Sequence, residues 1–238
     1  MIKDRISYAL RNLKAALPQW HNAPSWQRAF RTLQRHGFCP NAIFDIGVAH
    51  GTPALYRAFP HAKYFLVDPD PQSLPKMVRL MGPLNASVHA VGLGDVEGEL
   101  QFEMRPDLQG STFLKATVGG VPGAKYITVP VQRFDRLFTV FPRQCLVKID
   151  VQGYEYKVLC GMEGVLDRID AVIVECSTIA TLDNAPEVGA VMEFMMHHGF
   201  VLADVIGMLR RPYDDATAQL DLLFMPDKAA FRQDRRWA

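Results

Sequence analysis

The sequence predicts a single α/β domain built around a mostly parallel β-sheet. From residue 41 onward, short apolar runs alternate with helix-sized segments, a pattern typical of a parallel sheet covered by helices on both faces. The length of 238 residues suits one such domain, and 49% hydrophobic against 21% charged residues excludes collagen-like, low-complexity and disordered chains. We expect the sheet domain over residues 41–226, a helical cap over residues 1–40 and a basic tail over residues 227–238.

The cap is predicted to contain two helices. The first ends before Pro18, and its apolar residues recur at helical spacing: Ile2, Ile6, Leu10, Leu13 and Leu17. The second is predicted to begin at Ser25, after Pro24, and to stop at Gly37. Together the two helices form the expected N-terminal cap.

Short apolar runs predict the strands of the sheet, with helices filling most of the gaps between them. The parallel strands are expected over residues 42–46, 64–68, 87–93, 146–150 and 171–175. A helix over residues 186–198 then leads to a closing pair of strands over 200–206 and 220–225.

Two further segments interrupt this alternation. Residues 100–104 and 127–131 alternate apolar and polar side chains, which predicts half-buried edge strands. The segment between them, residues 105–125, is rich in Gly, Ser and Thr, and loops of this length are usually functional or disordered. We expect this loop to contribute to a site.

The charge distribution and the cysteines indicate which cellular compartment and which kinds of partner to expect. The net charge of +1 gives no electrostatic footprint for nucleic acid, although residues 1–36 carry +6 and residues 228–238 carry +3. Solvated helix faces and a frayed tail explain these basic ends, with weak contact of the N-terminal helix to a membrane surface or a carrier as the alternative. The absence of a long apolar stretch, of a signal core and of any Cys-x-x-Cys pair predicts a cytoplasmic protein with free, buried thiols. Nothing in the sequence indicates an oligomeric state.

The turn after the first predicted strand is the first candidate binding element. It has the form D-x-G-x-x-x-G, with Asp45, Gly47 and Gly51, and with His50 inside the loop. Asp45 stands where a dinucleotide fingerprint has its first glycine, and a carboxylate there would repel a pyrophosphate. S-adenosylmethionine has no phosphate and carries an ammonium and a sulfonium, so Asp45 favours this cofactor.

Acidic residues also end the next two predicted strands. Asp68 follows the last loop glycine at close to the spacing at which a carboxylate reaches ribose hydroxyls. Asp95, after Gly94, is placed to accept a hydrogen bond from an adenine amine. Because ligands of open α/β sheets bind at the carboxyl edge, three acidic residues at three consecutive strand ends predict a cofactor site there.

The motif series resembles that of FkbM-type methyltransferases. The matching segments are Phe44-Asp45-Ile46-Gly47, Val67-Asp68-Pro69-Asp70-Pro71, Val91-Gly92-Leu93-Gly94-Asp95 and Val147-Lys148-Ile149-Asp150-Val151-Gln152-Gly153-Tyr154-Glu155. The resemblance implies a Rossmann-like class I methyltransferase domain, with a seven-stranded sheet whose last strand is antiparallel. It also implies S-adenosylmethionine as cofactor and a hydroxyl of a sugar, polysaccharide or other natural product as acceptor. The loop residues Val48-Ala49-His50, and Asp68 in place of the usual Glu, depart from the family pattern.

The acceptor side is predicted to lie at the ends of the fourth and fifth strands. Methyl transfer to an alcohol needs removal of a proton, so Asp150, with Lys148 as electrostatic partner and Glu175 on the neighbouring strand, form the candidate catalytic group. Glu155 is expected to orient the following helix, with direct chemistry as the alternative. Only two convergent carboxylates are evident, so we expect no obligatory metal and assign no metal ligand.

Two other functions stay open on the sequence alone. A nicotinamide-dependent oxidoreductase would keep the ribose contact of Asp68 but lacks the pyrophosphate glycines. A non-catalytic relic of the methyltransferase fold would retain the same residues without activity. The identity of the acceptor is not encoded in these motifs.

Overall fold

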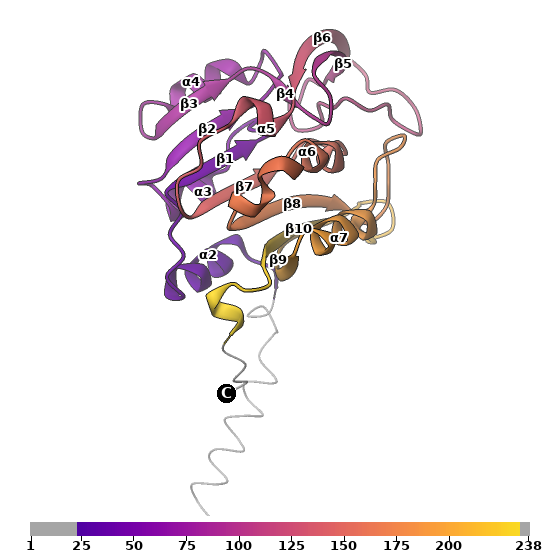
Figure 1. Cartoon of the computed structure of the whole chain (residues 1–238). Coiled ribbons are helices and arrows are strands. Elements are labelled where there is room, and N and C mark those ends of the chain that lie inside the picture. Colours follow the sequence, from indigo (N-terminus) through magenta and orange to yellow (C-terminus); the bar gives the residue numbers. More distant parts are fainter. Residues whose placement is uncertain (1–22, 234–238) are drawn as a thin grey trace, which may run out of the picture.

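The computed structural model describes residues 23–233 and centres on one large β-sheet. The sheet has seven strands in the order β3-β2-β1-β7-β8-β10-β9. Their bounds are β1 Ala42–Ile46, β2 Lys63–Val67, β3 Asn85–His89, β7 Cys145–Ile149, β8 Ala171–Ser177, β9 Phe200–Arg210 and β10 Thr217–Pro226. All pairs are parallel except those of β10, which is antiparallel to both β8 and β9. The predicted seven-stranded sheet with its antiparallel last strand is confirmed (Figure 1).

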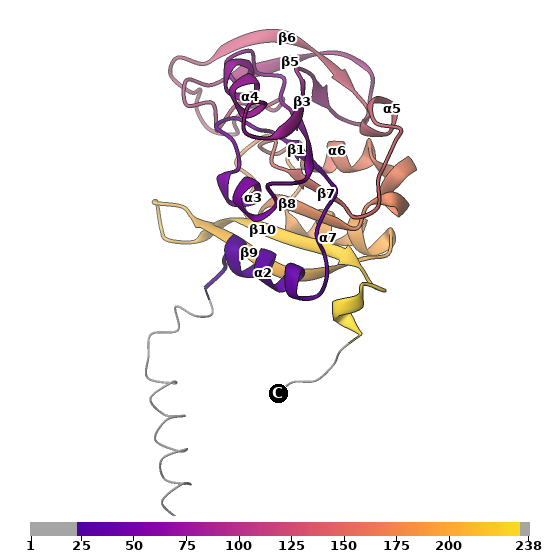
Figure 2. The ribbon, with the colours of Figure 1, turned by 90° about the vertical axis from the view of Figure 1, so that its left-hand side faces the viewer.

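Helices cover both faces of the sheet, as Figure 1 and the turned view of Figure 2 show. One face is covered by α2 (Trp26–Arg35), α3 (Pro53–Ala58) and α4 (Leu74–Leu80), whose apolar residues share a core with alternate strand residues. The other face is covered by α5 (Phe134–Leu137), α6 (Glu155–Cys160) and α7 (Val188–His197), which pack on the intervening strand residues. Each central strand is therefore buried on both faces, as expected for continuous apolar runs.

A second, smaller sheet accounts for the alternating segments. It holds β4 (Gly92–Leu93), β5 (Gly98–Met104) and β6 (Lys125–Gln132) in the order β4-β6-β5. The single strand predicted over residues 87–93 was wrong, because β3 ends at His89 and β4 pairs with β6 instead. The two predicted edge strands pair with each other, antiparallel, in this separate sheet.

Of the predicted cap, the structure describes the second helix. The helix predicted to begin at Ser25 is α2, and Ser25 is its N-cap, since its side chain accepts a hydrogen bond from the Arg28 N–H at 3.4 Å. The buried side of α2 includes Phe30, which meets Phe59 edge-on with ring centroids 5.1 Å apart. The first predicted helix and most basic residues of the N-terminal segment lie outside the described residues.

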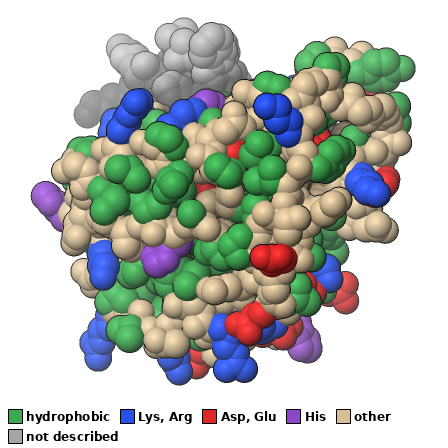
Figure 3. All heavy atoms as spheres, turned by 90° about the horizontal axis from the view of Figure 1, so that it is seen from above, with side chains coloured by type: hydrophobic (Ala, Val, Ile, Leu, Met, Phe, Trp, Pro, Cys, Tyr) green, Lys and Arg blue, Asp and Glu red, His purple; other side chains and the backbone are tan. Residues whose placement is uncertain are grey.

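Three further features complete the chain. The 3₁₀ helices η2 (Glu163–Arg168) and η3 (Ala230–Arg232) follow α6 and β10. Across residues 23–233, no helix has the length and apolarity that crossing a membrane requires. On the face seen from above, Lys and Arg side chains are separated by apolar surface and by acidic side chains (Figure 3).

The parallel strands bring the predicted site residues to one edge. The strands β1 and β7 pair so that Asp45 lies opposite Lys148. The strands β8 and β10 pair so that Glu175 lies opposite Asp221. Because paired residues present their side chains on the same face, charged side chains from four adjacent strands gather where the sheet meets the loops after β1 and β7.

Candidate active site

The loop after β1 depends on a glycine at its first position. Gly47 has φ +76°, and a Cβ there would lie 1.7 Å from the carbonyl oxygen of Asp150, so no side chain fits. The loop after β1 therefore lies directly against the loop after β7. Gly51, at φ +93°, closes the same turn before α3 begins at Pro53.

Asp68 fastens this loop and lines the adjoining cavity. Its Oδ2 accepts a hydrogen bond from the Ala49 N–H at 2.8 Å, and its Oδ1 accepts one from the Asp70 N–H at 2.8 Å. Asp68 is buried, and burial raises the pKa of its carboxyl group. Loop position and any ribose contact thus depend on the same carboxylate.

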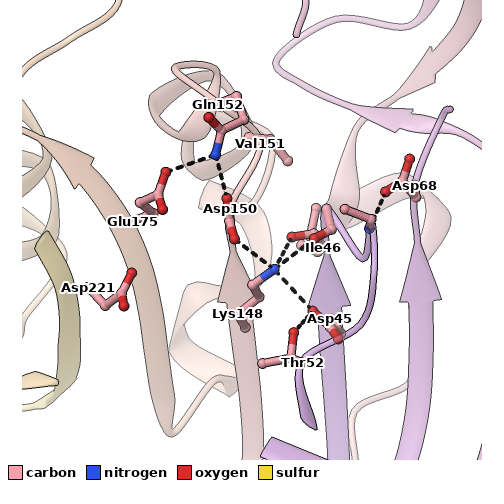
Figure 4. A network of polar contacts seen from close by, with 12 residues as sticks. Asp45, Ile46, Thr52, Asp68, Lys148, Asp150, Val151, Gln152, Glu175 and Asp221 are labelled. Carbon is pink, nitrogen blue, oxygen red and sulfur yellow. Dashed lines mark hydrogen bonds and ion pairs between the residues drawn. The ribbon is translucent and has the colours of Figure 1, made fainter. Parts of the chain in front are cut away.

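Lys148 lies beneath the loop as the central cation (Figure 4). Its Nζ is 3.3 Å from Asp45 Oδ1 and 3.3 Å from Asp150 Oδ2, and it donates to the Gly47 carbonyl at 2.7 Å. Burial alone would lower the pKa of Lys148, but the Asp150 and Asp45 carboxylates raise it above its ordinary value. The lysine therefore stays charged and ties β1, its loop and the end of β7 together.

The structure changes the role expected for Asp45. Its carboxylate is fully buried and is not among the residues that line the cavity. Oδ2 accepts from the Tyr56 hydroxyl at 2.5 Å, Oδ1 accepts from the Thr52 hydroxyl at 3.2 Å, and Lys148 neutralises the charge. Direct attraction of a cationic cofactor to Asp45 is therefore replaced by support of Lys148 and of the first turn of α3.

Asp150 and Glu175 are brought together through an amide. Gln152 Nε2 donates to Asp150 Oδ1 at 2.9 Å and to Glu175 Oε1 at 2.9 Å, as the dashed lines in Figure 4 show. Gln219 Nε2, from β10, donates to the same Glu175 oxygen at 2.7 Å. Burial, followed by the charge of Asp150, raises the pKa of Glu175 above its ordinary value, which favours the protonated form of this side chain.

The long loop after β5 forms the roof of the cavity. The His50 ring bridges the Asp107 carbonyl, 3.0 Å from Nε2, and Lys76 Nζ, 2.5 Å from Nδ1. The Ser111 hydroxyl donates to Asp70 Oδ2 at 2.9 Å, and the Thr112 hydroxyl donates to the Gln152 carbonyl at 2.7 Å. The loop hydroxyls thus anchor the roof to the loops after β2 and β7.

Asp95 is the predicted cofactor residue that the structure does not bring to the others. Its carboxylate pairs with Lys157 Nζ at 2.7 Å and is not among the lining residues. The same segment reaches the cavity through Val91, Gly92 and Leu93, which offer apolar surface and backbone.

Glu155 holds the loop after β7 rather than the helix that we expected it to orient. Its Oε1 accepts from the Val151 N–H at 3.0 Å and from the Gly153 N–H at 3.1 Å. The side chain is buried, and burial raises the pKa of Glu155 to about 7. Its hydrogen bonds hold the segment that carries Gln152.

We expect Glu155→Gln to remove a pH dependence of stability. The folded state binds this proton more tightly than the unfolded state, whose pKa is near 4.5, so wild-type stability falls as pH rises through about 7. The amide keeps the acceptor oxygen but cannot ionise. Thermal unfolding from pH 5 to 8 should show the melting temperature of the variant, relative to wild type, rising with pH by about 2 to 6 °C. A constant difference across this range would contradict the buried ionisation of Glu155.

One cavity is lined both by predicted cofactor-binding residues and by the predicted catalytic residues. It has a volume of about 430 Å³, within the range of small-molecule sites. Its lining runs along the sheet edge from Asp68 after β2, past the backbone of residues 47–51 after β1 with Lys148 beneath them, to Asp150 after β7 and Glu175 on β8. We call its two sides the Asp68 end and the Asp150 end. Among residues 23–233, no group of three or more His, Cys, Asp and Glu side chains is arranged to hold a metal ion.

The structure adds site residues that the sequence analysis did not select. Gln152 and Gln219 orient the two carboxyl groups, and Leu209 adds apolar surface to the cavity. Gln152 lies inside the motif after β7, which was a usable signal in the sequence, and the structure adds that its φ is +53°, rare for residues other than glycine. Gln219 begins a terminal strand segment, residues 219–224, that resembles the family's, but its role depends on the pairing of β10 with β8, which the sequence does not show.

A sheet of this strand order, with a glycine-dependent turn after β1 and a carboxylate at the end of β2, defines a protein of the class I methyltransferase type. The model of the FkbM methyltransferase domain matches residues 45–202. The chain belongs to this family, which confirms the resemblance read from its motifs.

Individual relatives are more distant. The hexuronic acid methyltransferase AglP of Haloferax volcanii is 27% identical over 153 residues, which cover 63% of this chain and 61% of that protein. Magnesium protoporphyrin IX methyltransferase of Synechocystis, solved with S-adenosylmethionine bound, is 12% identical, with a TM-score of 0.45 over 84% of this chain and 77% of that one. An RNA methyltransferase-like structure from Pyrococcus horikoshii is 12% identical, with a TM-score of 0.44 over 84% of this chain and 81% of that one.

Proposed function

We propose that this methyltransferase uses S-adenosylmethionine to methylate a hydroxyl group of a sugar or other natural product, with Asp150 as the general base. The observation that carries the proposal is the single cavity shared by the Asp68 end and the Asp150 end. Membership of the FkbM family supports the cofactor, and the hexuronic acid methyltransferase relative supports a sugar as acceptor.

The residues of the Asp68 end fit this cofactor. The Asp68 carboxylate is placed to accept from ribose hydroxyls, and the turn from Gly47 to Gly51 lets a ligand approach the backbone. Val91 and Leu93 offer an apolar wall for the adenine. His50, which lines the cavity and contacts Lys76 from α4, provides a polar group that suits a carboxylate at the methionine end.

The residues of the other end fit removal of a proton. When bound, S-adenosylmethionine supplies a methyl group activated by a sulfonium. Asp150 is the candidate base because its carboxylate is 35% exposed, whereas burial and the charge of Asp150 raise the pKa of Glu175. Lys148 and Gln152 fix the two oxygens of Asp150, so that the base meets the acceptor in one orientation.

A methyl-transfer assay tests the proposal. The purified chain is incubated with S-adenosylmethionine labelled in its methyl group and with neutral and acidic glycosides, and the labelled product is treated with mild base. We expect a base-stable ether, because the site is proposed to deprotonate a hydroxyl. Label in a base-labile ester or on nitrogen would overturn O-methylation of a hydroxyl.

Asp68→Ala is expected to weaken S-adenosylmethionine binding by about 1 to 3 kcal/mol, because it removes a buried acceptor of ribose hydroxyls and releases the Ala49 N–H. Isothermal titration calorimetry measures the change. Asp167→Ala, on the exposed side of η2, removes the same side chain away from the cavity and should bind as wild type does. Equal affinities for the two folded variants would remove Asp68 from the site.

A further inference from the structure

Asp221 is a partly buried carboxylate next to the acceptor end, and the mechanism above assigns it no role. It lies on β10, directly opposite Glu175 on β8. Opposed residues of an antiparallel pair have Cβ atoms about 4.5 to 5.5 Å apart, on the same face of the sheet. Figure 4 shows both side chains on the same side of the polar group around Lys148.

Residues of α2 and β9 fix the position of the Asp221 side chain. The Trp26 indole N–H, from α2, donates to Asp221 Oδ2 at 2.8 Å. Gly207, its partner on β9, leaves the space: a Cβ at residue 207 would lie 1.8 Å from Asp221 Oδ2. Any other residue at 207 would displace the carboxylate, so the fold holds Asp221 in place from both sides.

The charges that face Glu175 are mostly negative. Asp150 at the end of β7 raises the pKa of Glu175 most, followed by Glu155 from α6 and Asp221 from β10, whereas the cation Lys148 lowers it. Lys148 already pairs with Asp45 and Asp150. The direct partners of Glu175, Gln152 and Gln219, are neutral amides that both donate to Oε1. Burial raises the pKa of Asp221, whereas the Trp26 hydrogen bond and the charge of Lys148 lower it. In its ionised form, this carboxylate opposite Glu175 favours a proton on Glu175 Oε2.

We propose that Asp221, held by Trp26 in the space left by Gly207, is a positioning residue that keeps Glu175 protonated at the acceptor end of the cavity. Glu175 then donates a hydrogen bond to an acceptor oxygen next to the reacting hydroxyl, while Asp150 alone takes the proton. Two carboxyl groups joined by one amide thus hold different roles because their surroundings differ. The donor role toward the acceptor rests on the proposed function, whereas the protonation of Glu175 does not.

Nuclear magnetic resonance titration of the full chain, with ¹³C in the glutamate carboxyl groups, tests the proposal. The Glu175 signal is assigned by its loss in Glu175→Gln, and its titration midpoint is followed from pH 4 to 10. We expect a wild-type midpoint well above the ordinary glutamate value. Asp221→Asn, which keeps the shape and removes the charge, should lower this midpoint by about one to two pH units.

Two further variants keep the test decisive. Trp26→Phe removes the indole donor, which both releases Asp221 and makes its ionisation less favourable, so the Glu175 midpoint should fall by a smaller amount. Asp204→Asn removes an exposed carboxylate from β9 and should leave the midpoint unchanged. If Asp221→Asn does not fold, Trp26→Phe against Asp204→Asn decides the question.

A wild-type midpoint near the ordinary glutamate value, or a midpoint that Asp221→Asn and Trp26→Phe leave in place, would overturn the proposal. The titration needs neither cofactor nor acceptor, so its failure differs from failure of the proposed function. A high, Asp221-dependent midpoint in a chain that binds no S-adenosylmethionine would reject the proposed function and leave the pairing of Asp221 with Glu175 intact.

Discussion

Replacing Asp150 with asparagine is expected to lower turnover by about 10² to 10⁴, because the variant keeps the size of the side chain but cannot take the acceptor proton. Affinity for S-adenosylmethionine should stay close to wild type, because Asp150 lies at the end of the cavity opposite Asp68. Turnover is measured by methyl transfer to any acceptor that the assay identifies, and affinity by calorimetry.

Glu175→Gln is the informative companion to Asp150→Asn. An amide still donates a hydrogen bond, so this variant should lose far less turnover, about tenfold or less. Asp204→Asn, on the exposed side of β9, is the inert control. Normal turnover in Asp150→Asn together with a collapse in Glu175→Gln would exchange the two roles, and loss of cofactor binding in Asp150→Asn would move Asp150 to the cofactor end.

Lys148→Met should cost about 3 to 5 kcal/mol of folding free energy, because it leaves Asp45 charged and buried without its cation. The structure makes this loss of stability the main expected effect of the change. Urea unfolding of wild type and variant gives the difference. Adding Asp45→Asn to Lys148→Met removes the stranded charge and should restore part of the loss.

Lys157→Met provides the matched control for Lys148→Met. Its ion pair with Asp95 has a lysine side chain that is 49% exposed, and such pairs contribute about 0 to 1 kcal/mol. A similar loss of stability in both variants would show that Lys148 acts as an ordinary surface lysine and that Asp45 does not depend on it.

The parts of the fold that could be predicted are those with a local signal. Each central strand is an apolar run buried on both faces, and the turn at Gly47 is required by a close backbone approach, so both leave a clear pattern in the sequence. The division of residues 87–93 between two sheets leaves no such pattern. An apolar run shows that a segment is buried, but it does not show which strand it pairs with.

The residues of the candidate site also fall into those that the sequence could predict and those that it could not. Asp68 and Asp150 could be selected because they end predicted strands, and both line the cavity. The burial of Asp45 could not, since it depends on Tyr56 from α3 and on Lys148 from β7. The Trp26 contact with Asp221 joins residues 195 positions apart. Spacing patterns in a sequence predict contacts within one helix, strand or motif, so they could not predict this contact.

The proposed function places S-adenosylmethionine at the Asp68 end of the cavity and the chemistry at the Asp150 end. Calorimetric titration of wild type and Asp150→Asn with S-adenosylmethionine, and of wild type with NADH, separates these two roles. We expect both proteins to bind S-adenosylmethionine with similar affinity and wild type not to bind NADH. Binding of NADH in preference to S-adenosylmethionine, or binding of S-adenosylmethionine that disappears in Asp150→Asn, would contradict the proposed function.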